Sequence, residues 1–137
     1  MTDNTIMKTE PAAKAGCVNC PVPDVPRLHT LFLGVTEDCN MRCRYCFVHH
    51  NPARMTLDTA MKALYFLLAQ CDPKSKKTPS ITFFGGEPTL EWDSIIVPIV
   101  KRGRELTDNK MSFNITSNGV LLDRDRLEFM KANNIGL

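Results

Sequence analysis

The sequence predicts an α/β fold with a parallel sheet, in which short apolar strands alternate with amphipathic helices. Apolar runs at residues 28–35, 80–84 and 111–116 are short and end at turn residues, which is typical of buried strands. Apolar residues recur with helical spacing over residues 57–68 and 96–106, between these runs. Alternating strands and helices favour parallel strands joined by right-handed crossovers. A complete barrel of eight such units takes about 250 residues, so about three βα units predict the front part of a larger, truncated domain.

Residues 1–27 differ in composition from the rest of the chain. They contain Pro11, Pro21, Pro23 and Pro26 and little hydrophobic periodicity, which predicts a flexible, proline-rich arm. We therefore expect the folded domain to occupy residues 28–137.

Composition and charge exclude several classes of function. The net charge of +2 is too close to neutral to predict binding to nucleic acid or an anionic membrane. The longest uninterrupted apolar run, Ala63 to Ala69, is far shorter than the roughly 20 residues of a membrane span. Residues 1–15 have no apolar segment typical of a secretory signal, so we expect a cytoplasmic, reducing location. The six cysteines then indicate metal ligands or catalytic thiols before disulfides.

The predicted elements follow one another in a regular order. The strand at 28–35 leads into a cysteine-rich loop, and Thr56 is a suitable N-cap for the helix at 57–68. Its apolar stripe comprises Leu57, Ala60, Met61, Leu64, Leu67 and Leu68. The strand at 80–84 ends at two glycines, and because Pro98 is tolerated only in a first turn, we expect the next helix to begin near Asp93 or Ser94.

The last part of the chain repeats the strand and helix pattern. The strand at 111–116 is followed by a turn at 116–119 and by a short helix at 123–132, for which Asp123 is the expected N-cap. Residues 135–137 resemble the start of a fourth strand, cut short at the end of the sequence.

Three cysteines form the strongest chemical signal in the sequence. Cys39, Cys43 and Cys46 place three thiols within one short loop, directly after a predicted strand. The same spacing also matches one face of a helix, so the thiols would pack into a core in the simplest alternative. A zinc ion held by three protein ligands is a second alternative. An iron–sulfur cubane held by three thiolates would leave one iron free to bind a substrate.

Two polar turns follow the next two strands. The first is Gly85-Gly86-Glu87-Pro88, where residues without Cβ let a ligand approach the backbone and a carboxylate can face an ammonium group. The second, Thr116-Ser117-Asn118-Gly119, is by itself most simply an Asn-Gly turn. A parallel barrel would gather the cysteine loop and both turns at the carboxyl ends of its strands, where barrel enzymes build their active sites.

The spacing C-x3-C-x2-C with Tyr45 before the last cysteine, followed by GGEP, resembles the radical S-adenosylmethionine (radical SAM) enzymes. The resemblance covers about residues 28–137 and implies a partial TIM-like (β/α) barrel. It implies that Cys39, Cys43 and Cys46 ligate a 4Fe-4S cluster and that Tyr45 lies against the cofactor. Gly85, Gly86 and Glu87 would bind the methionyl end of S-adenosylmethionine, and Asn118 would border that pocket.

The family resemblance also implies an activity. In such enzymes the reduced cluster cleaves S-adenosylmethionine to a 5'-deoxyadenosyl radical that abstracts hydrogen, and a flavodoxin or ferredoxin supplies the electron. The motifs are most similar to those of peptide and protein maturases of the sulfatase-maturing, SPASM-type branch, which implies a peptide or protein substrate. The alternatives are a non-enzymatic iron–sulfur, zinc-binding or electron-transfer module, and an inactive truncated remnant.

The remaining candidate ligands have simpler interpretations. Cys17 and Cys20 form a C-x2-C pair without a second pair, and we expect free thiols rather than half of a metal site. Cys71, at the end of the first predicted helix, is expected to be a structural or incidental cysteine. Histidines 49 and 50 and arginines 42 and 44 are expected to be solvated, although the arginines would suit the docking of an acidic electron donor.

Overall fold

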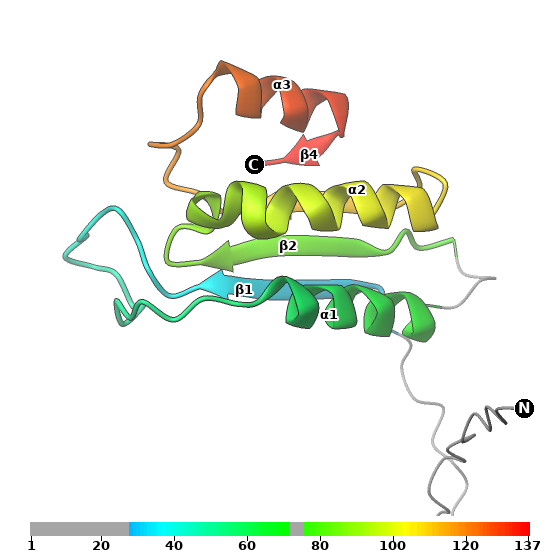
Figure 1. The fold of residues 1–137 in the computed structure, drawn as a ribbon, viewed down its shortest axis with the longest axis horizontal. Helices are drawn as coiled ribbons and strands as arrows, with labels where there is room; N and C mark the ends of the chain where they lie inside the picture. The colour runs from blue at the N-terminus through cyan, green and yellow to red at the C-terminus, as the bar shows by residue number, and fades with distance from the viewer. Residues whose placement is uncertain (1–27, 72–75) are drawn as a thin grey trace, which may run out of the picture.

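The computed structural model describes residues 28–71 and 76–137, which form one layer of helices on a four-stranded parallel sheet (Figure 1). The strands are β1 (Thr30–Thr36), β2 (Ser80–Gly85), β3 (Ser112–Ile115) and β4 (Ile135–Gly136), and they lie in the order β1-β2-β3-β4. Each neighbouring pair is parallel. The predicted α/β class and the parallel connections are confirmed. The proline-rich arm predicted for residues 1–27 lies outside the described residues.

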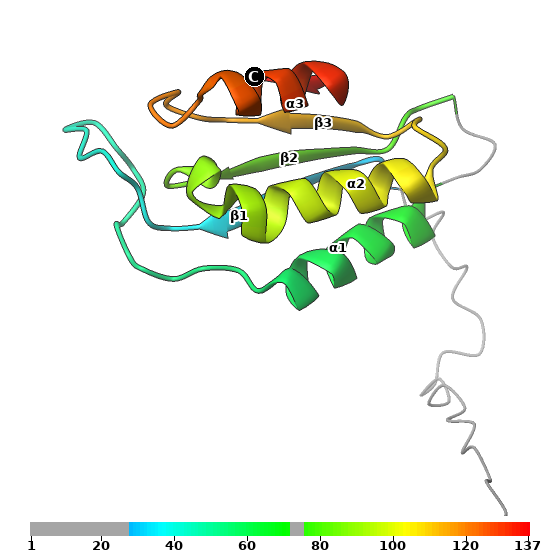
Figure 2. The same cartoon turned by 45° about the horizontal axis from the view of Figure 1, so that its top comes forward.

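The two faces of the sheet have different surroundings. Alternate residues of the strands, such as Val35, Phe83 and Phe113, are at most 1% exposed and point toward the helices. The rings of Phe83 and Phe113 stack with centroids 6.2 Å apart. On the opposite face, Phe32 is 65% exposed and meets Phe84 edge to face. Figure 2 shows α1 and α2 along one face only, which leaves the second face of the sheet uncovered by these helices.

The first helix, α1 (Leu57–Gln70), begins where the sequence predicts. The Thr56 hydroxyl accepts a hydrogen bond from the backbone N–H of Thr59 and so caps the first turn. The helix buries Ala60, Leu64 and Leu67 of the predicted apolar stripe. The hydrophobic period therefore decides which face of α1 meets the sheet.

The second helix is preceded by irregular helical turns. Helical structure starts with a 3-10 turn, η1 (Pro88–Glu91), continues through a π turn, η2 (Trp92–Ile96), and ends as α2 (Val97–Leu106). Glu87 caps the 3-10 turn, because its carboxylate accepts from the N–H of Thr89. In the π turn, Val97 N–H bonds to the carbonyl of Trp92 directly before Pro98. The α-helix proper therefore begins three to four residues after the expected start near Asp93 or Ser94, and Pro98 lies in its first turn as predicted.

The last helix, α3 (Arg124–Ala132), has Asp123 as its N-cap, with the carboxylate accepting from the N–H of Arg126 at 2.8 Å. It packs on η2 through an edge-to-face contact between Phe129 and Trp92. No helix within residues 28–71 and 76–137 is long and apolar enough to cross a membrane.

Candidate functional site

Three loops meet at the carboxyl edge of the sheet. They are the cysteine loop (residues 37–55, after β1), the GGEP turn (residues 85–88, after β2) and the TSNG turn (residues 116–119, after β3). The backbone N–H groups of Gly86 and Glu87 donate to the carbonyl oxygens of Thr36 and Asp38, each at 2.8 Å. The GGEP turn is therefore bonded directly to the segment that precedes Cys39.

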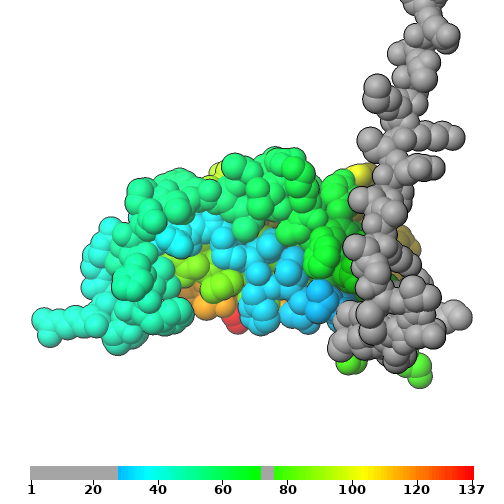
Figure 3. Space-filling view, turned by 90° about the horizontal axis from the view of Figure 1, so that it is seen from below, coloured from blue at the N-terminus to red at the C-terminus, as the bar shows by residue number. Residues whose placement is uncertain are grey.

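The cysteine loop is closed at its base and projects from the sheet (Figure 3, cyan). Thr36 and Arg54 form an antiparallel bridge, and Met55 N–H donates to Val35 O at 2.8 Å. Glu37 N–H and the Thr36 hydroxyl both donate to the carbonyl of Ala53, at 3.0 and 3.1 Å. These bonds fix the two ends of the loop, so its position does not depend on the residues at its tip.

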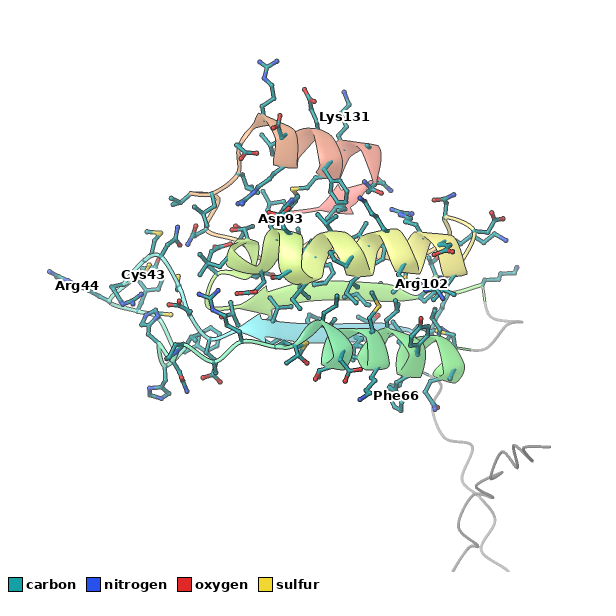
Figure 4. All side chains as sticks on the ribbon, viewed as in Figure 1. Cys43, Arg44, Phe66, Asp93, Arg102 and Lys131 are labelled. Atoms are coloured by element: carbon teal, nitrogen blue, oxygen red, sulfur yellow. The ribbon has the colours of Figure 1, made fainter. Side chains whose placement is uncertain are left out.

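The three predicted ligands all lie on this loop. Cys39 and Cys43 are half-buried, whereas Cys46 is exposed. Figure 4 shows Cys43 and Arg44 on the part of the loop that extends away from the sheet. Among the described residues, no three Cys, His, Asp or Glu side chains are grouped closely enough to hold a metal ion. Three thiols on one loop nevertheless form a soft donor set, which suits iron–sulfur chemistry.

The two glycines of the GGEP turn are required by close backbone contacts. A Cβ at Gly85 would lie 2.1 Å from the carbonyl oxygen of Thr36, and Gly85 has a φ of 142°, which side chains rarely adopt. A Cβ at Gly86 would lie 2.1 Å from the carbonyl oxygen of Asp38. The glycines therefore let the GGEP turn approach the cysteine loop, in addition to any role with a ligand.

Glu87 connects two of the three loops. Its side chain is fully buried, and one carboxylate oxygen accepts from the Thr89 N–H at 3.0 Å and from the Ser117 hydroxyl at 2.8 Å. The Thr89 hydroxyl donates to the same oxygen. The second oxygen accepts from the Asn118 N–H at 2.8 Å. The carboxylate thus holds the TSNG turn against the GGEP turn.

Asn118 completes the ring of contacts by reaching back to the cysteine loop. Its amide nitrogen lies 2.8 Å from Oδ1 of Asn40 and 3.7 Å from Sγ of Cys39. The cysteine loop, the GGEP turn and the TSNG turn are therefore linked in pairs, and the predicted residues Cys39, Glu87 and Asn118 lie within one bonded network.

An arginine that the sequence did not single out braces the same edge. Arg54 forms ion pairs with Asp38 at 3.3 Å and with Glu91 at 2.8 Å, and the Glu91 side chain is only 6% exposed. Glu91 also accepts from the Ser94 hydroxyl at 2.6 Å. The ion pairs join the base of the cysteine loop to the first helical turn after GGEP. No local motif in the sequence indicates this contact, because its partners are far apart along the chain.

The other candidates take little part in this network. Tyr45 is 90% exposed and, in this structure, does not pack against the GGEP or TSNG turn. The Cys71 thiol donates to the carbonyl of Leu28, and burial raises the pKa of this thiol, as expected for a structural cysteine. The pair Cys17 and Cys20 lies outside the described residues.

Comparison with known proteins gives a consistent result for most of the chain. The family model described as the Radical SAM superfamily matches residues 33–137. The radical SAM cyclopropyl synthase TigE of Paramaledivibacter caminithermalis is 26% identical over 125 residues, which cover 80% of this chain and 26% of that protein. The GTP 3',8-cyclase of Chlorobaculum tepidum is 36% identical over 94 residues, which cover 67% of this chain and 26% of that protein. This chain therefore spans about a quarter of the length of these two relatives.

Solved structures share the fold. The structure described as native anSMEcpe with bound AdoMet and Cp18Cys peptide aligns with a TM-score of 0.61 at 24% identity, covering 77% of this chain and 29% of that one. A second structure, with AdoMet alone, gives the same TM-score at 23% identity over 77% of this chain and 30% of the other. The sheet and its helices thus correspond to the partial barrel of these proteins. Together with the family match over residues 33–137, this shows that the chain belongs to the radical SAM superfamily.

Proposed function

We propose that this chain forms the cofactor-binding part of a radical SAM enzyme that modifies a peptide or protein. The observation that carries this proposal is the bonded ring of three loops, which places the cysteine motif, GGEP and TSNG at one edge of the sheet. Superfamily membership implies a 4Fe-4S cluster and S-adenosylmethionine as cofactors. When bound and reduced, this pair supplies a 5'-deoxyadenosyl radical that abstracts hydrogen from a substrate.

The chain's own residues would divide the binding work. Cys39, Cys43 and Cys46 would hold the cluster through their thiolates. Gly85 and Gly86, whose lack of Cβ brings the GGEP turn against the cysteine loop, would bind the methionyl end of the cofactor. Glu87, whose carboxylate accepts four hydrogen bonds from Thr89, Ser117 and Asn118, would complete the methionyl site and hold its turns together.

Tyr45 and Asn118 complete the proposed pocket. Tyr45, now exposed, would come to lie against the cofactor when the tip of the cysteine loop closes around the cluster. Asn118 would border the pocket from the TSNG turn. Only the tip would have to move for this, because the base of the loop is fixed by its hydrogen bonds.

The electron donor would be a flavodoxin or ferredoxin. The projecting part of the cysteine loop carries Arg42 and Arg44 and the exposed rings of Tyr45 and Phe47. Cationic groups with neighbouring exposed rings fit the acidic, flat surface of such a donor.

The peptide or protein substrate is supported by the similarity of the cysteine, GGEP and TSNG motifs to those of the maturases. A small-molecule substrate is the second candidate, because the GTP 3',8-cyclase is more identical over its aligned part than the cyclopropyl synthase. With either substrate the protein would be an enzyme that consumes S-adenosylmethionine. A metal-binding or electron-transfer module would instead bind a cluster or zinc without turning over S-adenosylmethionine.

The experiment is anaerobic reconstitution of the protein with iron and sulfide, followed by reduction and addition of S-adenosylmethionine. The proposal predicts release of 5'-deoxyadenosine, which Cys43→Ala abolishes and Cys71→Ala leaves intact. Tightly bound zinc with no iron, or a cluster that leaves S-adenosylmethionine unchanged, would instead favour the non-enzymatic module. Transfer of deuterium into 5'-deoxyadenosine from a deuterated peptide library, but not from deuterated nucleotides, would support the maturase assignment.

A further inference from the structure

The orientation of the Asn118 side chain is determined by its partners. Its amide oxygen accepts a hydrogen bond from the N–H of Val120 at 3.0 Å, as in an Asx turn. The amide nitrogen must therefore face the other way, where it meets Oδ1 of Asn40 at 2.8 Å and Sγ of Cys39 at 3.7 Å. The amide oxygen and the amide nitrogen thus both have partners, and a flipped amide would place nitrogen against the Val120 N–H and oxygen against the Asn40 oxygen.

The backbone of Asn118 is held as firmly as its side chain. Its N–H donates to the buried carboxylate of Glu87 at 2.8 Å, and the Ser117 hydroxyl donates to the same carboxylate at 2.8 Å. The Ser117 oxygen in turn accepts from the N–H of Gly119 at 3.0 Å. Hydrogen bonds to a buried carboxylate are charge-assisted and strong, so the Asn118 amide is placed beside Cys39 before any cofactor binds.

A donor at this position has a specific consequence for a thiolate ligand of a cluster. Hydrogen bonds to ligand sulfur favour the more electron-rich, reduced state and raise the reduction potential. We propose that Asn118 is a positioning residue that donates its amide N–H to the Cys39 thiolate and makes the cluster easier to reduce. This inference rests on the proposed function, because it needs Cys39 to ligate the cluster.

Three variants separate this effect from simple support of the loop. Asn118→Leu removes both donors. Asn118→Asp removes them as well but keeps an oxygen for the Val120 N–H. Asn40→Asp is the matched control, because it adds the same charge beside Cys39 and keeps the oxygen that accepts from Asn118.

The measurement is an electron paramagnetic resonance redox titration of the reconstituted protein and its variants. We expect Asn118→Leu to lower the ratio of reduced to oxidised cluster at a fixed potential by about tenfold, which is a shift of about 59 mV for one electron. Asn118→Asp should shift the midpoint further in the negative direction than Asn40→Asp does. An Asn118→Leu midpoint equal to that of the wild type, or equal shifts for the two Asp variants, would overturn the inference.

A second readout uses the metal-free protein and is independent of the proposed function. In Asn118→Leu, backbone amides of residues 39–42 should exchange hydrogen faster than in the wild type, while amides of β2 keep their rate. Unchanged exchange at 39–42 would show that the contact is absent and would overturn the inference. If Asn118→Leu exchanges faster than the wild type at residues 39–42 but the wild-type protein takes up no iron, the result would count against the proposed function alone.

Discussion

Replacing Glu87 with glutamine tests whether the buried carboxylate joins the loops of the site. Glutamine has the same side-chain shape as glutamate and keeps one oxygen, which can still accept hydrogen bonds from Thr89 and Ser117. Its amide nitrogen replaces the oxygen that accepts from the Asn118 N–H, so two donors face each other. A hydrogen bond to a charged group contributes about 1.5–3 kcal/mol, and an unsatisfied buried donor costs about 1–3 kcal/mol.

Because the variant loses a charge-assisted bond and leaves two donors facing each other beside a buried side chain, we expect it to lose about 3 kcal/mol of unfolding free energy. Urea unfolding of the metal-free protein measures this loss. With a slope of about 2 kcal/mol per molar urea, the midpoint should fall by about 1.5 M while the slope stays constant. The control is Glu128→Gln on the exposed side of α3, which should change the free energy by less than about 0.5 kcal/mol. If Glu87→Gln unfolds at the wild-type midpoint, as the control is expected to do, Glu87 does not hold the loops together.

Three further predictions concern the same edge of the sheet. Arg54→Met removes the cationic partner of the nearly buried Glu91 and should lower the free energy of unfolding by about 1–3 kcal/mol; a thermal midpoint equal to that of the wild type would contradict it. Gly86→Ala places a Cβ 2.1 Å from a carbonyl oxygen of the cysteine loop, so circular dichroism should show clear destabilisation and iron uptake should fall. Gly34→Ala, whose Cβ would make an ordinary 3.7 Å contact, should behave like the wild type, and equal losses in both variants would refute the steric argument. In the metal-free protein, peptide mapping after iodoacetamide treatment should find Cys71 labelled more slowly than the cysteines of the loop, because burial raises its pKa; equal rates would show that its thiol is not shielded.

The sequence was sufficient for the parts of the fold that depend on local patterns. The period of α1 and the caps at Thr56 and Asp123 could be predicted, because an N-cap and an apolar stripe are short-range signals. The exact start of α2 could not be predicted, because a helical period does not distinguish the 3-10 and π turns before Val97 from the α-helix, although Pro98 falls in the first turn as expected.

The site shows the same division between local and long-range information. The cysteine spacing and the GGEP turn are visible as motifs, and strand order predicts that they meet at one edge. The clamp from Arg54 to Glu91 and the bonds from Glu87 to the TSNG turn are invisible in the sequence, because each joins residues separated by about thirty or more positions. Such contacts depend on the packing of the sheet, which a motif does not encode.

The central claim is that the three cysteines of the loop hold a cluster that binds S-adenosylmethionine. The most direct test is to reconstitute the protein anaerobically, count its iron and record the electron paramagnetic resonance spectrum with and without S-adenosylmethionine. We predict about four irons in the cluster held by these cysteines and a spectrum that changes when S-adenosylmethionine is added. A cluster that persists in Cys43→Ala, or a spectrum that S-adenosylmethionine leaves unchanged, would contradict the claim.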